Sequence, residues 1–185
     1  ITIALSKLGN IKDIEKKHID MIIDMVKKSQ TGARLSLPNN VTVYKEYEYM
    51  VITNKKTDIK MATEWAFRTG VTKIEDFGKI KIAKTKRMEP SINGLVIDAD
   101  KVPQGAIWRM RKEGDVFTKF GGGTKKLKAY MIDKKIPARL RDYIPVLANG
   151  NDILVIAGVE ISDKLRVTEQ TTNMLNIEYV NLKWD

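Results

Sequence analysis

The stretch from Phe120 to Tyr143, FGGGTKKLKAYMIDKKIPARLRDY, is the part of the sequence best suited to chemistry, because glycine amides and lysines together bind phosphate groups. A nucleotide-binding P-loop ends in Gly-Lys-Ser/Thr, so that its lysine reaches the phosphates. Here the order is Gly123-Thr124-Lys125, no glycine stands at the required distance before it, and no Gly-x-Gly-x-x-Gly frame is present. The pattern favours phosphate contact at a helix start without phosphate chemistry. A simple tight turn is the alternative.

Other catalytic or metal-binding sites find little support. The chain has no cysteine and one histidine, His18, which lies on the apolar stripe of an expected helix, as packed or boundary residues do. Asp98 and Asp100 share one face of an expected strand, and such pairs usually accept hydrogen bonds from turn N–H groups. We therefore expect no catalytic residue, no metal site and no bound cofactor in this chain.

The positive charge is concentrated in one segment. Residues 101–147 carry 12 Lys/Arg and 4 Asp/Glu, whereas the rest of the chain carries 21 and 19. A local excess of this kind argues for an anionic partner, of which the backbone of a double-helical nucleic acid fits best. A solvated basic face, or contact with a protein or a membrane surface, remains the alternative. Stacking on single strands is less favoured, because Phe117, Phe120 and Tyr130 are interpreted as core.

The elements around this segment follow from hydrophobic spacing. Apolar residues at helical intervals predict a helix from Ile11 to Lys28, ending before Gly32. An alternating pattern over residues 34–51 predicts a hairpin that turns at Asn39-Asn40. Short strands are expected at 59–67, 78–86 and 94–100. The alternating lysines of the strand at 78–86 indicate a solvent-exposed face or a protected sheet edge.

A second module begins near Pro103. We expect a strand that ends at the Gly114-Asp115 turn, a helix capped by Thr124 that carries Leu127, Tyr130 and Met131, and a short helix from Pro137 through Tyr143. A hairpin turning at Asn149-Gly150 and a last strand in the tail complete it. The fold class is α+β: an N-terminal helix, a small mixed or antiparallel β module and a C-terminal α+β module.

Residues 98–168 closely resemble the C-terminal region of bacterial tRNA(Ile)-lysidine synthases. The matches occur in the family's order, and they are Arg109-x-Arg111, Gly114-Asp115-x-Phe117, Gly123-x-Lys125-Lys126-Leu127-Lys128, Lys135-Ile136-Pro137, Arg141-Asp142 with Pro145, and Ile161-Ser162. The chain departs from the family pattern at Val116, where many members have arginine, and at Leu165, where an aromatic residue is common. The upstream residues resemble the middle region of the family more weakly.

The resemblance implies an enzyme that uses ATP and magnesium to attach lysine to the wobble cytidine of an isoleucine tRNA. In the family this chemistry belongs to an N-terminal domain with a Ser-Gly-Gly-x-Asp-Ser motif. That motif does not occur in this sequence and the chain begins at Ile1, so we expect the catalytic domain to be absent. The expected organisation is a helical segment at 1–30, a middle β-rich tRNA domain at 31–102 and a C-terminal tRNA-binding domain at 103–185.

The resemblance also implies partners and contact residues. The partners are tRNA(Ile), held by its acceptor stem, and the enzyme's own catalytic domain; a homodimer is possible, and no membrane is expected, since no apolar run is long enough to span one. The expected location is the cytoplasm. Lys125, Lys126 and Lys128 are the leading RNA contacts, and the further candidates are Arg109, Arg111, Lys134, Lys135, Arg139 and Arg141. Asp115 is interpreted as structural. The alternative function is a structural or dimerising module with little direct RNA contact.

Overall fold

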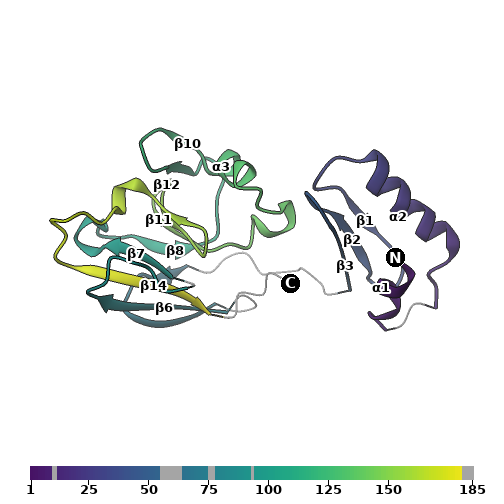
Figure 1. Cartoon of the computed structure of the whole chain (residues 1–185), viewed down its shortest axis with the longest axis horizontal. Coiled ribbons are helices and arrows are strands. Elements are labelled where there is room, and N and C mark those ends of the chain that lie inside the picture. The colour runs from purple at the N-terminus through teal and green to yellow at the C-terminus, as the bar shows by residue number, and fades with distance from the viewer. Residues whose placement is uncertain (10–11, 55–63, 75–77, 93, 181–185) are drawn as a thin grey trace. The chain divides into compact units, whose positions relative to one another are not determined.

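The computed structural model describes residues 1–9, 12–54, 64–74, 78–92 and 94–180. Contacts divide the chain into two compact units, and Figure 1 labels most of their helices and strands. Unit 1 consists of Ile1–Asp58 and Lys135–Arg139, and unit 2 of Ile59–Lys134 and Leu140–Asp185. The contacts thus group the helix of the predicted 1–30 segment with the strands that follow it. The predicted boundaries at residues 30 and 102 stay predictions.

The described part of unit 1 is built from two helices and one antiparallel sheet. The helices are α1 (Thr2–Ser6) and α2 (Lys16–Lys28), and the sheet has the order β1 (Arg34–Ser36), β2 (Thr42–Lys45), β3 (Met50–Thr53). Asn39 and Asn40 have φ values of 60° and 58°, which confirms the predicted turn, because asparagine tolerates the left-handed region better than most residues. The hairpin continues into β3, so the alternating stretch forms three strands.

The boundaries of α2 differ from the prediction at its start. Glu15 is the extended N-cap, and its side chain and that of His18 exchange hydrogen bonds with each other's backbone amides. This capping box starts the helix at Lys16, and Ile11 lies outside the described residues. The helix ends at Lys28, as predicted, but Gly32 is not its cap: the Gly32 amide donates to the Lys45 carbonyl at 2.6 Å.

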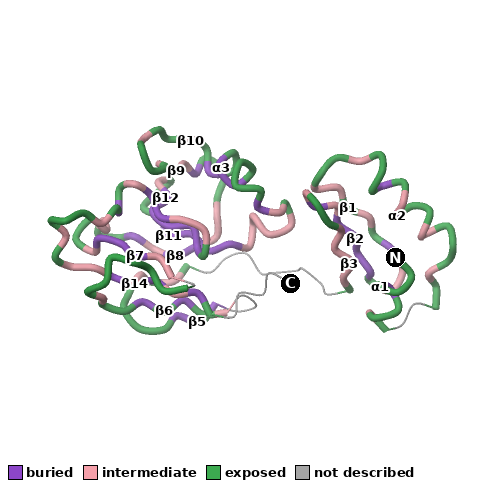
Figure 2. The backbone as a smooth tube through the Cα atoms, viewed as in Figure 1, coloured by how far each residue is buried: buried purple, intermediate pink, exposed green. Residues whose placement is uncertain are grey.

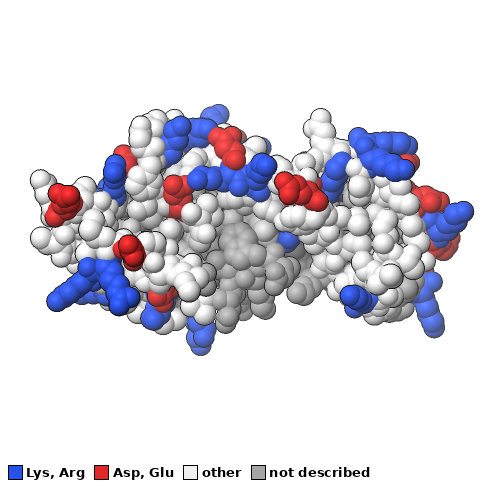
Figure 3. All heavy atoms as spheres, viewed as in Figure 1, with Lys and Arg blue, Asp and Glu red and all other residues white. Residues whose placement is uncertain are grey.

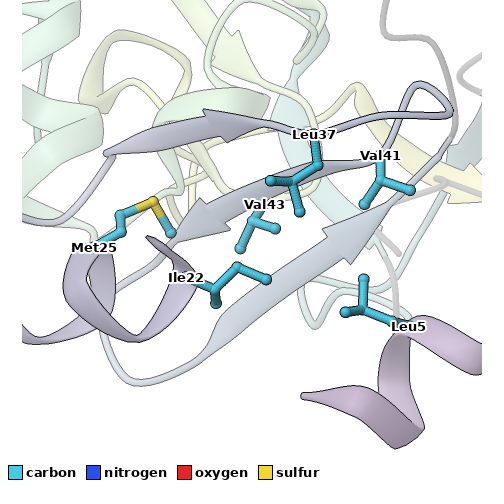
Figure 4. Close-up of a cluster of buried hydrophobic side chains, with 6 residues drawn as sticks. All are labelled: Leu5, Ile22, Met25, Leu37, Val41 and Val43. Atoms are coloured by element: carbon cyan, nitrogen blue, oxygen red, sulfur yellow. The ribbon is translucent and has the colours of Figure 1, made fainter. Parts of the chain in front are cut away.

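The core of unit 1 joins both helices to the sheet. Figure 4 shows its six buried side chains: Leu5 from α1, Ile22 and Met25 from α2, and Leu37, Val41 and Val43 from the β1–β2 hairpin. The apolar stripe predicted for α2 therefore packs against one face of the sheet, as is typical of an amphipathic helix.

Unit 2 contains two sheets. One is four-stranded and antiparallel, in the order β5 (Gly70–Ile74), β6 (Gly78–Thr85), β14 (Met174–Val180), β7 (Gly94–Asp98). Along β6 the lysines are exposed while Ile80 and Ile82 are buried, as predicted, but the strand lies inside the sheet rather than at its edge.

The second sheet has seven strands and holds the basic segment. Its order is β10 (Thr124–Lys126), β9 (Val116–Thr118), β12 (Asp152–Ile156), β11 (Val146–Asn149), β8 (Ile107–Arg109), β4 (Trp65–Ala66), with β13 (Glu160–Ile161) on β12. Figure 2 shows the burial of β11 and β12 at its centre. The hairpin between them turns at Gly150-Asn151, one residue later than predicted, because Asn149 pairs with Asp152.

Helical structure in the second half of the chain is short. In the described residues it consists of α3 (Leu127–Asp133) and three 3-10 turns, η1 (Ala99–Lys101), η2 (Ala138–Leu140) and η3 (Asp163–Leu165). Leu127, Tyr130 and Met131 of α3 are buried, as the sequence predicts. The helix predicted from Pro137 through Tyr143 is reduced to η2. The fold class is α+β, as predicted from the sequence.

Candidate nucleic-acid interface

The three glycines of the basic segment form a hairpin loop. Thr118 of β9 pairs with Thr124 of β10 and their hydroxyls are 2.9 Å apart, so residues 119–123 connect the two strands. Gly121, Gly122 and Gly123 have φ values of 78°, 83° and 86°, a run that only glycine adopts without strain. The prediction that Thr124 caps a helix here is wrong, since α3 begins at Leu127, behind a three-residue strand.

The strand separates the lysines of the motif into two roles. Lys125 lies opposite buried Phe117 and its ammonium forms an ion pair with Asp133. Lys126 and Lys128 are exposed, and neither has a side-chain partner among the residues that the structure describes. The predicted group of three is therefore one ion-paired lysine and two that are open to an external anion.

Lys119 joins these two lysines, although it is not among the contacts predicted from the sequence. It is exposed in the hairpin loop, with its Cε 3.7 Å from the position that a Cβ on Gly123 would take, and it has no side-chain partner within the described part of the chain. The sequence does contain a sign of this: Lys119 lies between an expected strand and three glycines, and a lysine in such a loop is expected to be exposed. We call Lys119, Phe120, Lys126 and Lys128 the hairpin surface.

Arg109 is buried and engaged by protein groups. Its guanidinium makes two hydrogen bonds to the Asp115 carboxylate, at 2.9 and 2.7 Å, and donates to the carbonyls of Met110 and Gly150 at 2.9 and 2.7 Å. Only 3% of its surface is exposed. The interpretation of Asp115 as a structural residue that binds an arginine is confirmed, and we remove Arg109 from the candidate RNA contacts.

The other candidates are mostly engaged as well. Arg111 forms an ion pair with Asp142, and Lys134 lies 2.6 Å from Glu160 and 5.5 Å from the centre of the Tyr130 ring. Arg141 is half-buried and already interacts with protein groups. Lys135 and Arg139 belong to unit 1, where Lys135 is exposed with a φ of 53° and Arg139 donates to Glu46 at 3.2 Å.

The charges around the hairpin are mixed. Figure 3 shows acidic and basic side chains next to one another over the part of unit 2 that holds β10 and α3. Glu160 also accepts a hydrogen bond from Tyr130, and burial together with this carboxylate raises the pKa of the phenol. The net positive segment is thus a mixture of internal ion pairs and a few unpaired lysines, and only the latter are available without breaking a contact.

The carboxylates and the histidine that could bind a metal or take part in catalysis have structural roles. Asp98 ends β7 and accepts hydrogen bonds from the Asp100 amide at 3.2 Å and the Thr171 hydroxyl at 2.7 Å. Asp100 accepts from Asn173, and His18 belongs to the capping box of α2. Among the described residues, no three His, Cys, Asp or Glu side chains gather as metal ligands do.

Phe117 and Tyr130 are buried, with ring centres 4.5 Å apart, but Phe120 is 40% exposed, so its prediction as core is wrong. Within the described ranges, no helix combines the length and apolarity that a membrane crossing requires.

The chain is similar to known proteins along most of its length. A tRNA(Ile)-lysidine synthase of Caldanaerobacter subterraneus subsp. tengcongensis is 34% identical over 178 residues, which are 92% of this chain and 38% of that protein. One of Clostridium tetani is 33% identical over 180 residues, again 92% of this chain and 38% of that protein. The chain thus spans less than half the length of these relatives.

A solved structure and a family model match as well. The structure, described as "Crystal structure of TILS C-terminal domain", aligns with a TM-score of 0.43 and 22% identity, over 82% of this chain and 94% of that one. The family model for the TilS substrate C-terminal domain matches residues 106–179, which include the β9–β10 hairpin. Residues 106–179 thus match the TilS substrate C-terminal domain model, within a chain that is similar to tRNA(Ile)-lysidine synthases over 92% of its length.

Proposed function

We propose that this chain is the tRNA-binding part of a tRNA(Ile)-lysidine synthase and that its hairpin surface contacts the phosphate backbone of the acceptor stem. The observation that carries the proposal is that Lys119, Lys126 and Lys128 are exposed without a side-chain partner among the described residues, inside the segment that matches the family model. We take tRNA(Ile) as the RNA because the relatives are tRNA(Ile)-lysidine synthases.

Unpaired lysines suit this role better than the ion-paired ones. A lysine that already pairs with a carboxylate must give up that contact before it binds a phosphate, whereas Lys126 and Lys128 only release counterions from the RNA. Arg109 is excluded on the same ground, because removing it from Asp115 leaves a buried charge without a partner.

We infer that the chemistry takes place outside this chain. The relatives are more than twice as long as the part that the chain spans, and the ATP, magnesium and catalytic residues needed to attach lysine to a wobble cytidine would belong to that remainder. In this proposal the chain holds the RNA, in the cytoplasm, while a catalytic domain acts on it.

The proposal is tested by titrating tRNA(Ile) at several salt concentrations against the chain and its Lys126→Ala/Lys128→Ala variant. We expect weaker binding and a salt slope smaller by roughly 1.4 to 1.8, because each phosphate contact contributes about 0.7 to 0.9. The matched control is Lys79→Ala/Lys84→Ala, which removes two exposed lysines of β6, on the opposite side of unit 2 from β10 in Figure 1. This control should bind almost as the parent does.

Three outcomes would contradict the proposal. Binding that is absent or independent of salt would exclude an electrostatic RNA contact. Equal losses in both double variants would show a general effect of net charge. An unchanged affinity in the Lys126/Lys128 variant, together with a dimer that forms as concentration rises, would favour the structural or dimerising module instead.

A further inference from the structure

Phe120 stands out among the aromatic residues of the hairpin region. Phe117 and Tyr130 are 0% and 4% exposed, whereas Phe120 keeps 40% of its surface in water, although it lies only three residues after Phe117. Single exposed apolar residues are common and need no special reason. Whether the exposure of Phe120 has a functional reason depends on the groups around its ring.

The ring is paired with a cation. The guanidinium carbon of Arg166 lies over the Phe120 ring, 5.7 Å from its centre. Arg166 follows η3, where Leu165 is fully buried, and its carbonyl accepts a hydrogen bond from Lys101 at 2.6 Å. The backbone that carries the guanidinium is therefore held in place.

A second contact ties this backbone to the hairpin. The Ser162 hydroxyl, at the N-cap of η3, donates to the Thr118 carbonyl at 3.1 Å, and Thr118 closes the loop that carries Phe120. Since Ser162 is fully buried, the link is protected from water. The aromatic–guanidinium pair is thus preorganised from two sides, which lowers the entropy lost when a ligand binds.

The loop beside the ring is open to a close approach. A Cβ added to Gly121 or Gly122 would meet no atom within 4 Å, so backbone and solvent are in direct contact there. Lys119, next to Phe120, supplies a charge without a side-chain partner in the described structure. Aromatic ring, guanidinium, bare backbone and lysine form a surface that suits a flat apolar group joined to an anion.

We propose that Phe120 and Arg166 form a stacking site for an unpaired nucleobase of RNA, at the point where a duplex ends. A nucleotide is a flat ring linked to a phosphate, and bases stack both on aromatic rings and on guanidinium planes. A protein partner would call for a wider apolar patch, whereas the neighbours of this ring are cations and glycines. The inference rests on the proposed function and adds the kind of nucleotide that this end of the surface recognises.

The test compares two RNA hairpins with the same stem, one blunt and one with a short 3′ overhang that contains 2-aminopurine. We expect the chain to prefer the overhang RNA by at least about fivefold and to quench the fluorescence of 2-aminopurine, as a stacked base requires. Phe120→Leu keeps an apolar side chain but loses the ring, and it should lose both the preference and the quenching. Phe120→Trp restores a ring and should restore both.

Each other result overturns the inference in a recognisable way. Equal, salt-dependent binding of both RNAs by the parent and by Phe120→Leu leaves the proposed function standing and removes the stacking site. An equal loss of affinity for both RNAs in Phe120→Leu shows that the ring only shapes the loop. No binding of either RNA by the parent removes the proposed function as well.

Discussion

Residues of the same type take different roles in this chain, according to whether a carboxylate lies within reach. Arg109 and Lys126 are both basic residues of the segment that matches the family model. The first is a buried ion-pair partner of Asp115, while the second is exposed and unpaired within the described structure. A basic run in a sequence does not distinguish them, because the acidic partners come from turns and helices elsewhere in the segment.

The Arg109–Asp115 pair provides a test of this difference. Asp115→Ala should lower the free energy of unfolding by about 3–5 kcal/mol, because it leaves the arginine buried without its partner. Asp133→Ala is the control, since it also removes an aspartate from an ion pair, but from one whose side chains are 36% and 55% exposed, where the cost is about 0–1 kcal/mol. Chemical denaturation measures both. Similar losses in the two variants would contradict the structural role of Arg109.

Asp98 predicts a dependence of stability on pH. Burial disfavours its charged form, but hydrogen bonds from Thr171, Lys101 and the Asp100 amide outweigh this and hold the pKa of the carboxyl below its ordinary value of 3.8. A lowered pKa adds stability that is complete above 3.8 and is lost as the pH falls through the folded-state value. The difference in unfolding free energy between the parent and Asp98→Asn should therefore shrink in acid. A difference that stays constant below pH 3.8 would show that the charge of Asp98 contributes nothing.

At the level of elements, the sequence predicts what local patterns determine. The alternation along β6, the Asn39-Asn40 turn and the buried positions of α3 all follow from spacing and turn chemistry, and the structure confirms them. The strand β10 could not be predicted, because Thr124-Lys125-Lys126 has no strand pattern and becomes extended only by pairing with β9. The exposure of Phe120 is missed for the same reason. The sequence predicts the ring just before a helix, but the pairing of β9 with β10 puts it in a hairpin loop.

Adding one methyl group to the glycine loop tests its backbone conformation. Gly122→Ala should destabilise the hairpin by about 1–2 kcal/mol, because an L-residue at a φ of 83° crowds its own backbone while the space around it is open. Asn40→Gly is the counterpart in unit 1 and should cause no loss, since glycine adopts a φ of 58° without strain. Hydrogen exchange of the β9 and β10 amides reports the effect of Gly122→Ala, and exchange of the β1 and β2 amides reports that of Asn40→Gly. Unchanged protection in Gly122→Ala would argue against this loop conformation.

On the scale of the whole molecule, the two units have cores of different size. Among the described residues, the core cluster of unit 1 has six buried apolar side chains, whereas unit 2 has two sheets. Small cores are marginally stable, so we expect two unfolding transitions, with unit 1 melting first. Ile22→Ala, which truncates a fully buried side chain at a cost of about 2–5 kcal/mol, should shift only the lower transition in calorimetry. One transition that moves as a whole would contradict this division.

The position of β10 at the end of its sheet has a consequence for solubility. The outer edge of this strand lies beyond the last pairing in the strand order, and an open edge invites the same strand of a second molecule to extend the sheet. Lys126, on that strand, and Lys128, just after it, repel such a copy. The lysines proposed to attract RNA thus also protect the edge strand against aggregation. Replacing them would weaken RNA binding and remove this protection at the same time.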